Sequence, residues 1–128
     1  DIICDTGHNV DGIKYVCGHL DFLHQKFNQE LHIVFGMVND KDISSVLQEL
    51  PKDATYYFTK ASVKRALPEN ELLALAEEAG LKGTTYPTVV EAVQAAKKNC
   101  PPKDLIFVGG SSFIVADLLA NRDTLNLY

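Results

Sequence analysis

The sequence predicts a doubly wound α/β fold, in which a mostly parallel sheet carries helices on both faces. Short apolar runs of strand length alternate along the chain with segments whose apolar residues recur every three or four positions, as on one face of a helix. A helix between two strands forms a crossover connection, and crossovers join parallel strands. The rhythm of the chain therefore predicts one parallel sheet covered by helices on both sides.

Length and composition indicate one domain over residues 1–128. A chain of 128 residues with 46% hydrophobic content has room for a full core, and it contains no repeat or internal linker. It starts with Asp1 and enters strand-like sequence at once, without a Met or a signal peptide. We therefore expect the domain to be cut from a longer protein.

The first predicted elements are two strands separated by a long helix. Ile2 to Cys4 is an apolar run, and residues at helical spacing follow from about Asp11 to Phe27. Leu31 to Phe35 is a second apolar run, interrupted only by His32 and ended by Gly36. This run predicts a strand buried on both faces.

The middle of the chain predicts a helix, a strand and a second helix. Apolar residues recur at helical spacing from Ile43 to Leu50, where Pro51 ends the helix. Tyr56 to Thr59 predicts the third strand, and a basic loop from Lys60 to Arg65 follows it. The next helix is expected to start near Pro68 and to end at Gly80.

The last third predicts two further strand and helix pairs. A weak strand is expected from Gly83 to Tyr86, and Thr88 to Glu91 has capping-box spacing for a helix that reaches about Asn99. Leu105 to Val108 is the clearest strand of the sequence. It runs into a glycine-serine turn, Gly109 to Ser112, and a final helix through Leu119.

Charge and cysteine content restrict the function. The net charge of −5 and a pI near 5.2 disfavour binding to nucleic acid or to an anionic membrane surface. No apolar run approaches the roughly 20 residues of a membrane span. The three cysteines form no C-x-x-C pair and suggest reduced core residues, so we expect a cytoplasmic protein with small-molecule or protein partners.

Polar residues follow four predicted strands, and parallel strands bring such loops to one edge of the sheet. The loops provide carboxylates, an imidazole, cations and a glycine-serine turn at a helix N-terminus, which suits a ligand that bears phosphate or carboxylate. The first loop concentrates Asp5, His8 and Asn9 within five residues. The alternative for these three is turn and capping chemistry alone. The four loops are Asp5 to Asn9, Asn39 to Asp42, Lys60 to Arg65 and Gly109 to Ser112.

No metal site is predicted. His19, His24 and His32 lie in a predicted helix or strand, without ligand partners at metal spacing. We interpret these three histidines as structural.

Four sequence blocks resemble the C-terminal domain of folylpolyglutamate synthase and dihydrofolate synthase, a branch of the Mur ligase superfamily. They appear in the family's order and span nearly the whole chain. The family usually has Ala and Pro where this chain has Gly7 and Val10, and Thr where it has Gly109. The blocks are Asp5-x-Gly-His8-Asn9-x-Asp11-Gly12, Phe35-Gly36-Met37 with Asp40-Lys41-Asp42, Arg65-Ala66-Leu67 and Val108-Gly-Gly-Ser111.

The resemblance implies an enzyme that phosphorylates a pteroate or folate carboxylate with ATP and joins L-glutamate to it. In the family an upstream domain carries the P-loop and the magnesium ligands. No G-x-x-x-x-G-K-[ST] occurs in this chain. We therefore expect an intramolecular ATPase domain as partner, ATP and Mg²⁺ as cofactors, a monomeric parent enzyme, and no activity of the isolated domain.

The resemblance also implies roles for individual residues in nucleotide binding. Asp5 corresponds to the residue that meets the ribose or adenine side of ATP. His8 corresponds to the catalytic residue that reaches toward the phosphates, with Asn9 as its turn-forming neighbour.

Substrate binding is assigned by the same resemblance. Ser111 corresponds to the serine that helps to receive the incoming amino acid, and Ser112 shares that work; a plain helix N-cap is the alternative for Ser111. Lys41 and Asp42 match a further substrate block, although a solvated loop charge is the alternative for Lys41.

Two other functions stay open. A peptidoglycan-type amino-acid ligase of the same superfamily is the nearer one. A stand-alone flavodoxin-like binding module would explain the fold and charge but not the four blocks. A dinucleotide-dependent oxidoreductase is disfavoured because no G-x-G-x-x-G follows the first strand. Whether the parent adds the first glutamate, later ones or both is left open.

Overall fold

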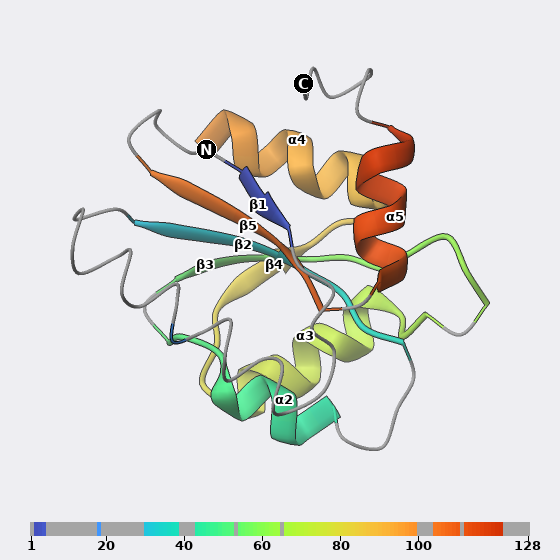
Figure 1. The fold of residues 1–128 in the computed structure, drawn as a ribbon. Helices are drawn as coiled ribbons and strands as arrows, with labels where there is room; N and C mark the ends of the chain where they lie inside the picture. Colours follow the sequence, from blue (N-terminus) through green and yellow to red (C-terminus); the bar gives the residue numbers. More distant parts are fainter. Residues whose placement is uncertain are drawn as a thin grey trace.

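A computed structural model describes residues 2–4, 18, 30–38, 43–52, 54–64, 66–99, 104–110 and 112–121. These residues form a sheet between two helical layers (Figure 1). The strands are β1 (Ile2–Cys4), β2 (Leu31–Phe35), β3 (Thr55–Phe58), β4 (Gly83–Thr85) and β5 (Leu105–Gly109). The helices are α2 (Ile43–Glu49), α3 (Glu69–Glu78), α4 (Val89–Asn99) and α5 (Ser112–Ala120).

The five described strands are all parallel and lie in the order β1-β5-β2-β3-β4. Strand β2 lies at the centre, where Ile33 pairs with Tyr56 on one side and with Phe107 on the other. The chain moves outward from β2 to β4 and then returns to place β5 between β1 and β2. This reversal is the feature of a doubly wound sheet, and it confirms the predicted fold.

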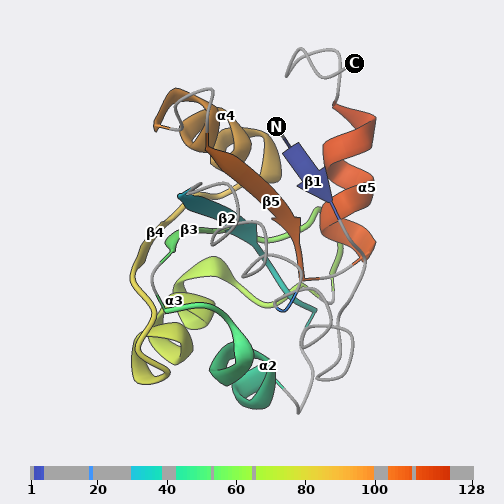
Figure 2. The same cartoon turned by 60° about the vertical axis from the view of Figure 1, so that its left-hand side comes forward.

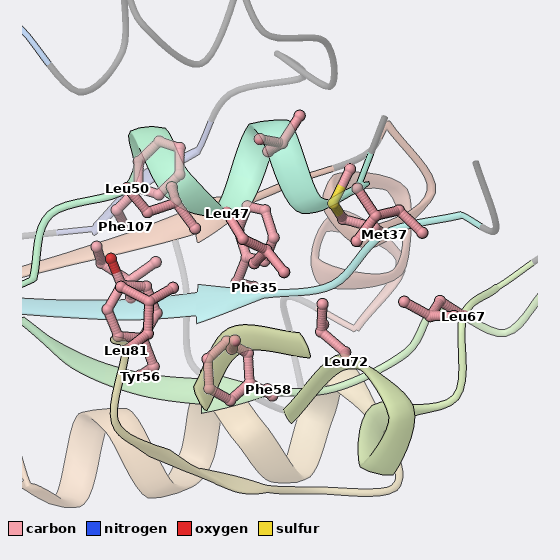
Figure 3. Close-up of a cluster of buried hydrophobic side chains, with 14 of the residues drawn as sticks. Phe35, Met37, Leu47, Leu50, Tyr56, Phe58, Leu67, Leu72, Leu81 and Phe107 are labelled. Carbon is pink, nitrogen blue, oxygen red and sulfur yellow. The ribbon is translucent and has the colours of Figure 1, made fainter. Parts of the chain in front are cut away.

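The α2 and α3 side of the sheet holds the larger core (Figure 3). Alternate residues of each central strand point to this side. Phe35, Phe58 and Phe107 come from three adjacent strands, and Leu47 of α2 and Leu72 of α3 cover them. All five are at most 3% exposed, so their burial stabilises the packing of both helices on the sheet.

The opposite side of the sheet packs against α4 and α5. The intervening strand residues, such as Val34 and Val108, belong to the same buried cluster as Val93 of α4. Ile114 and Leu118 of α5 complete the layer. With both faces covered, β2 and β5 are buried along their whole length, as their continuous apolar runs predicted.

The helix boundaries follow the predicted signals closely. Pro68 stands directly before α3, and Gly80 follows its end with φ +87°. At the start of α4, the backbone N–H of Glu91 donates to Oγ1 of Thr88 over 3.2 Å, which confirms the predicted cap. Strand β3 begins one residue earlier than predicted, at Thr55, and it ends at Phe58.

Part of the prediction concerns residues outside the described ranges. Of the helix expected from about Asp11 to Phe27, the structure describes only Gly18, which is helical. None of the helices among the described residues is long and apolar enough to cross a membrane.

Candidate functional site

Strands β2 and β5 are neighbours whose following segments go to opposite faces of the sheet. After β2 the chain passes to α2, and after β5 it passes to α5 on the other side (Figure 2). In open α/β sheets, ligands bind at such a switch point, outside the carboxyl ends of the strands. The candidate site is therefore the edge where β2 and β5 end, which we call the ligand edge.

Two glycines bring the backbones together at this switch point. Gly110 has φ +106°, and a Cβ atom there would lie 2.2 Å from the carbonyl oxygen of Gly36. A Cβ atom on Gly36 would lie 2.6 Å from the backbone carbonyl oxygen of Thr59 and 2.5 Å from Cδ1 of Ile114 in α5. The N–H of Gly36 also donates to the carbonyl of Gly109 over 3.3 Å. Only glycine at both positions lets the turn into α5 lie directly against the end of β2.

Thr59 continues β3 at the same edge. Its N–H donates to the carbonyl of Phe35 over 3.0 Å, which extends the pairing of β2 and β3 by one residue. The side chain is fully buried, yet its Oγ1 has no hydrogen-bond partner among the described residues. A buried hydroxyl without a partner lowers stability, and nothing in the local sequence distinguishes this threonine from a strand residue.

The segment after β3 is joined to the segment after β2. The N–H of Leu67 donates to the carbonyl of Met37 over 2.8 Å, and Ala66 forms an antiparallel bridge with Val38. This pairing was not predicted, because it joins two loops. It fixes the position from which residues 39–42 leave the edge.

The structure describes the strand ends that directly precede the predicted site residues, but it describes few of those residues themselves. Cys4, which directly precedes Asp5, pairs with Val108, so the ends of β1, β5 and β2 lie side by side. This confirms that three of the four predicted loops leave adjacent strands, and the fourth follows neighbouring β3. Ser112 begins α5. The other predicted site residues lie outside the described ranges: Asp5, His8, Asn9, Lys41, Asp42 and Ser111.

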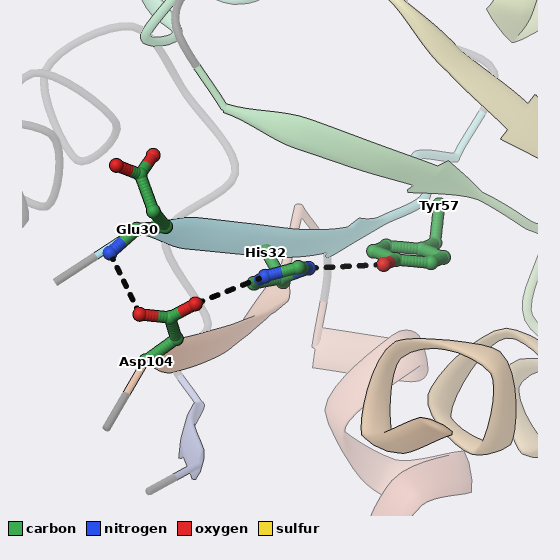
Figure 4. Close-up of polar contacts among 4 residues, drawn as sticks. All are labelled: Glu30, His32, Tyr57 and Asp104. Atoms are coloured by element: carbon green, nitrogen blue, oxygen red, sulfur yellow. Dashed lines mark hydrogen bonds and ion pairs between the residues drawn. The ribbon is translucent and has the colours of Figure 1, made fainter. Parts of the chain in front are cut away.

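A buried polar cluster lies at the opposite, amino end of the strands (Figure 4). Tyr57 donates its hydroxyl hydrogen to Nδ1 of His32 over 3.0 Å when Nε2 carries the imidazole proton. Nε2 then faces a carboxylate oxygen of Asp104 at 3.7 Å. The other oxygen of Asp104 accepts the N–H of Glu30 over 3.1 Å.

This cluster joins β2, β3 and the start of β5 by side-chain contacts. The His32 and Tyr57 rings stack with centroids 6.0 Å apart, and Asp104 is 3% exposed. The cluster lies at the end of the strands opposite to the candidate site, and His32 there contacts Tyr57 and Asp104 of the neighbouring segments. Among the described residues, no group of three or more metal-ligating side chains occurs. His19 and His24 lie outside the described ranges.

Known proteins resemble this chain over nearly its whole length. The dihydrofolate synthase/folylpolyglutamate synthase of Buchnera aphidicola is 32% identical over 130 residues, which cover 99% of this chain and 30% of that protein. The folylpolyglutamate synthase of Lacticaseibacillus casei is 29% identical over 110 residues, covering 84% of this chain and 24% of its own length. The chain thus spans less than a third of these relatives.

Solved structures agree with the sequence comparison. The structure described as E. coli FolC in complex with DHPP and ADP superposes with a TM-score of 0.85 at 26% identity, covering 98% of this chain and 29% of that one. The model of the Mur ligase glutamate ligase domain matches residues 1–112. This match includes β1 to β5 and the start of α5, hence every strand that forms the switch point. The chain therefore belongs to the Mur ligase family, as a glutamate ligase domain.

Proposed function

We propose that this chain is the C-terminal domain of an ATP-dependent ligase that joins L-glutamate to dihydropteroate or folate. The observation that supports it most is the switch point between β2 and β5, where a glycine-serine turn enters α5. A helix N-terminus at such a turn provides unpaired N–H groups for an anion. The relative solved with DHPP and ADP supports the same pair of ligands here.

The proposed reaction has two steps. A carboxylate oxygen of the pteroate or folate substrate attacks the γ-phosphorus of ATP, which gives an acyl phosphate and ADP. The amino nitrogen of glutamate then attacks the acyl carbon, loses a proton, and displaces inorganic phosphate as the amide forms. Bringing both substrates to one edge removes much of the entropic barrier of the second step.

On the nucleotide side, we assign roles to the loop that follows β1. Asp5 meets the ribose or adenine side of ATP, and His8 reaches its phosphates. Asn9 shapes the turn between the strand and the next helix. The position of β1 beside β5 supports this assignment, because the loop follows the end of β1 and the turn into α5 follows the end of β5.

On the amino-acid side, Ser111 and Ser112 at the start of α5 receive a carboxylate of glutamate. The hydroxyl groups and the first N–H groups of the helix act together on one anion. We also assign Lys41 and Asp42, from the segment between β2 and α2, to substrate binding. The N–H of Leu67 supports this segment by its hydrogen bond to Met37.

The remaining parts of the ligase lie outside this chain. We place the P-loop and the magnesium ligands in a separate ATPase domain of the same polypeptide, since the relatives are more than three times as long as their matched parts. Bound Mg²⁺ there would neutralise charge on the phosphates. An ATP-consuming folate ligase of this kind would work as a monomer in the cytoplasm.

Two substitutions in the full-length ligase test the assignment. Ser111→Ala removes one hydrogen bond to a charged group, worth about 1.5–3 kcal/mol, and leaves the helix N–H groups in place. We expect the KM for glutamate to rise at least about tenfold and the KM for ATP to change little. Ser44→Ala, on the exposed side of α2, is the matched control and should leave both constants unchanged.

The second substitution is His8→Ala. If His8 positions the phosphates, the rate of amide formation should fall by one or two powers of ten, about 1.4–2.7 kcal/mol at the barrier. If Ser111→Ala raised the KM for ATP and left the KM for glutamate unchanged, the glycine-serine turn would be assigned to ATP instead of glutamate. An unchanged rate in His8→Ala would return this histidine to a structural role.

A further inference from the structure

The loop between β3 and α3 is fastened to α5 by one carboxylate. Asp117 of α5 accepts the backbone N–H of Ser62 at Oδ2 over 2.8 Å and the Ser62 hydroxyl hydrogen at Oδ1 over 2.9 Å. The two residues are 55 positions apart in the chain. Both oxygens of the carboxylate are therefore used to hold a single residue of the loop. We name residues 60–67, of which Arg65 is not described, the bridging loop.

The bridging loop crosses from one face of the sheet to the other at the ligand edge. Near its start, Ala61 is 4% exposed and belongs to the core on the α4 and α5 side. At its end, Leu67 is 5% exposed and belongs to the core on the α2 and α3 side. Figure 1 shows the loop running from the end of β3 past the lower end of α5 before it returns to α3.

Three attachments thus fix the bridging loop along its length. Ala61 and Leu67 anchor its two ends in the two cores, and the Leu67 N–H bonds to Met37 in the segment after β2. Asp117 holds Ser62, the residue after Ala61. Ala61 packs in the core that α5 shares, and the Asp117 contact adds a hydrogen-bonded attachment to the same helix.

The loop presents positive charge on both sides of this contact. Lys60 and Lys64 are exposed and lie two residues before and two residues after Ser62. A carboxylate on a mobile substrate is attracted by such cations, but the attraction favours one geometry only if the loop is held in one place. The Asp117 carboxylate holds the loop in this position through its two hydrogen bonds with Ser62.

We propose that Asp117 is a positioning residue for the amino-acid substrate of the ligase. It holds the bridging loop against α5, so that the loop cations and the helix N-terminus keep one arrangement around an incoming carboxylate. Asp117 lies five residues beyond Ser112, about 7.5 Å along the helix axis, and acts through Ser62 rather than by contact with the substrate. The inference rests on the proposed function, and it adds residues outside the four sequence blocks of the family.

The geometric half of the inference is testable on the 128-residue chain without any ligand. Asp117→Ala should raise the hydrogen-exchange rate of the Ser62 amide at least about tenfold, because that amide loses its acceptor. The amides of Ala66 and Leu67, which donate to Val63 and Met37, serve as internal controls and should keep their rates. An unchanged Ser62 rate would overturn the inference, as would equal acceleration of all three amides.

The functional half uses the full-length ligase. Asp117→Ala should raise the KM for L-glutamate about five- to tenfold, with kcat and the KM for ATP within twofold. Asp117→Asn keeps an oxygen acceptor for one of the two bonds and should recover most of the wild-type KM. Adding Ser62→Ala to Asp117→Ala should have no further effect, because Asp117→Ala already removes both hydrogen bonds to Ser62. Glu78→Ala, an exposed acid at the end of α3, is the matched control.

The outcomes separate this inference from the proposed function. A wild-type enzyme that forms no glutamate amide would refute the proposed function, whatever the exchange data show. An active wild-type enzyme whose glutamate KM is unchanged in Asp117→Ala would refute the positioning role alone. Loss of folded protein with normal constants per folded molecule would make the contact merely structural and would also overturn it.

Discussion

At the residue scale, the ligand edge depends on a few positions where one residue type fits. Gly110 combines a left-handed backbone with a Cβ direction blocked by the carbonyl oxygen of Gly36. Gly80 has a similar φ of +87°, but among the described residues a Cβ atom there would meet only the flexible Lys52 side chain, at 3.5 Å. At Gly80 a substitution would therefore meet the strain of a positive φ alone, whereas at Gly110 it would also collide with backbone atoms.

Replacing each glycine by alanine measures the two effects. Gly80→Ala should cost about 1–2 kcal/mol of unfolding free energy, from the left-handed backbone alone. Gly110→Ala adds a collision with backbone atoms that cannot move aside, so we expect a loss above about 3 kcal/mol or failure to fold. Urea denaturation of both variants checks this, and equal losses would contradict the close approach of the β5 turn to β2.

Thr59, which is buried, and Thr88, which caps α4, give a second test at the residue scale. Thr59→Val replaces an unpaired buried hydroxyl by a methyl group and should raise the unfolding free energy by about 1 kcal/mol. Thr88→Val makes the same chemical change at the cap of α4 and should lower it by about 1 kcal/mol. Thermal unfolding should show that the changes in unfolding free energy of the two variants have opposite signs. Two losses of similar size would mean that the Thr59 hydroxyl has a partner.

At the element scale, the amino end of the sheet is joined by the His32, Tyr57 and Asp104 cluster. Asp104→Ala leaves the Glu30 N–H without its acceptor and removes the carboxylate beside His32. We expect a loss of about 1–3 kcal/mol in unfolding free energy. The control variant Glu78→Ala should keep its unfolding free energy within about 0.5 kcal/mol of the wild-type value.

Ligase activity per folded molecule should survive Asp104→Ala, because the cluster lies at the end of the strands opposite to the ligand edge. Activity in the full-length enzyme, normalised to the folded fraction, measures this. A fall in normalised activity would show that the cluster acts on the site.

The sequence predicted the described elements to within one or two residues because their signals are local. Continuous apolar runs indicated β2 and β5, and Pro68, Gly80 and Thr88 marked helix ends. The blocks of the resemblance named the site residues, and their side-chain placement stays a prediction.

The long-range polar contacts could not be predicted. Glu30 meets Asp104 across 74 positions, and Ser62 meets Asp117 across 55. No spacing rule relates residues so far apart. Such pairs emerge only when the strand order places β5 beside β2, with α5 above the end of β3.

At the scale of the whole molecule, the proposed function gives this chain one side of a ligand site, and its 128 residues contain no P-loop motif. Held by one side only, ATP loses most of the contacts that fix its triphosphate. We expect the 128-residue chain to fold but to bind ATP more weakly than about 1 mM, measured by calorimetry. Micromolar binding would favour a stand-alone nucleotide-binding module instead.

The proposed function makes the domain part of a ligase that consumes ATP to join glutamate to a pteroate or folate. The most direct measurement is the product balance of the purified full-length enzyme with ATP, L-glutamate, Mg²⁺ and dihydropteroate or a reduced folate. We predict one ADP, one phosphate and one new glutamyl amide per turnover by mass spectrometry, and no ADP release when glutamate and the pterin substrate are both left out. ADP release without amide, or an amide formed with a different amino acid in preference to glutamate, would refute the proposed ligase function.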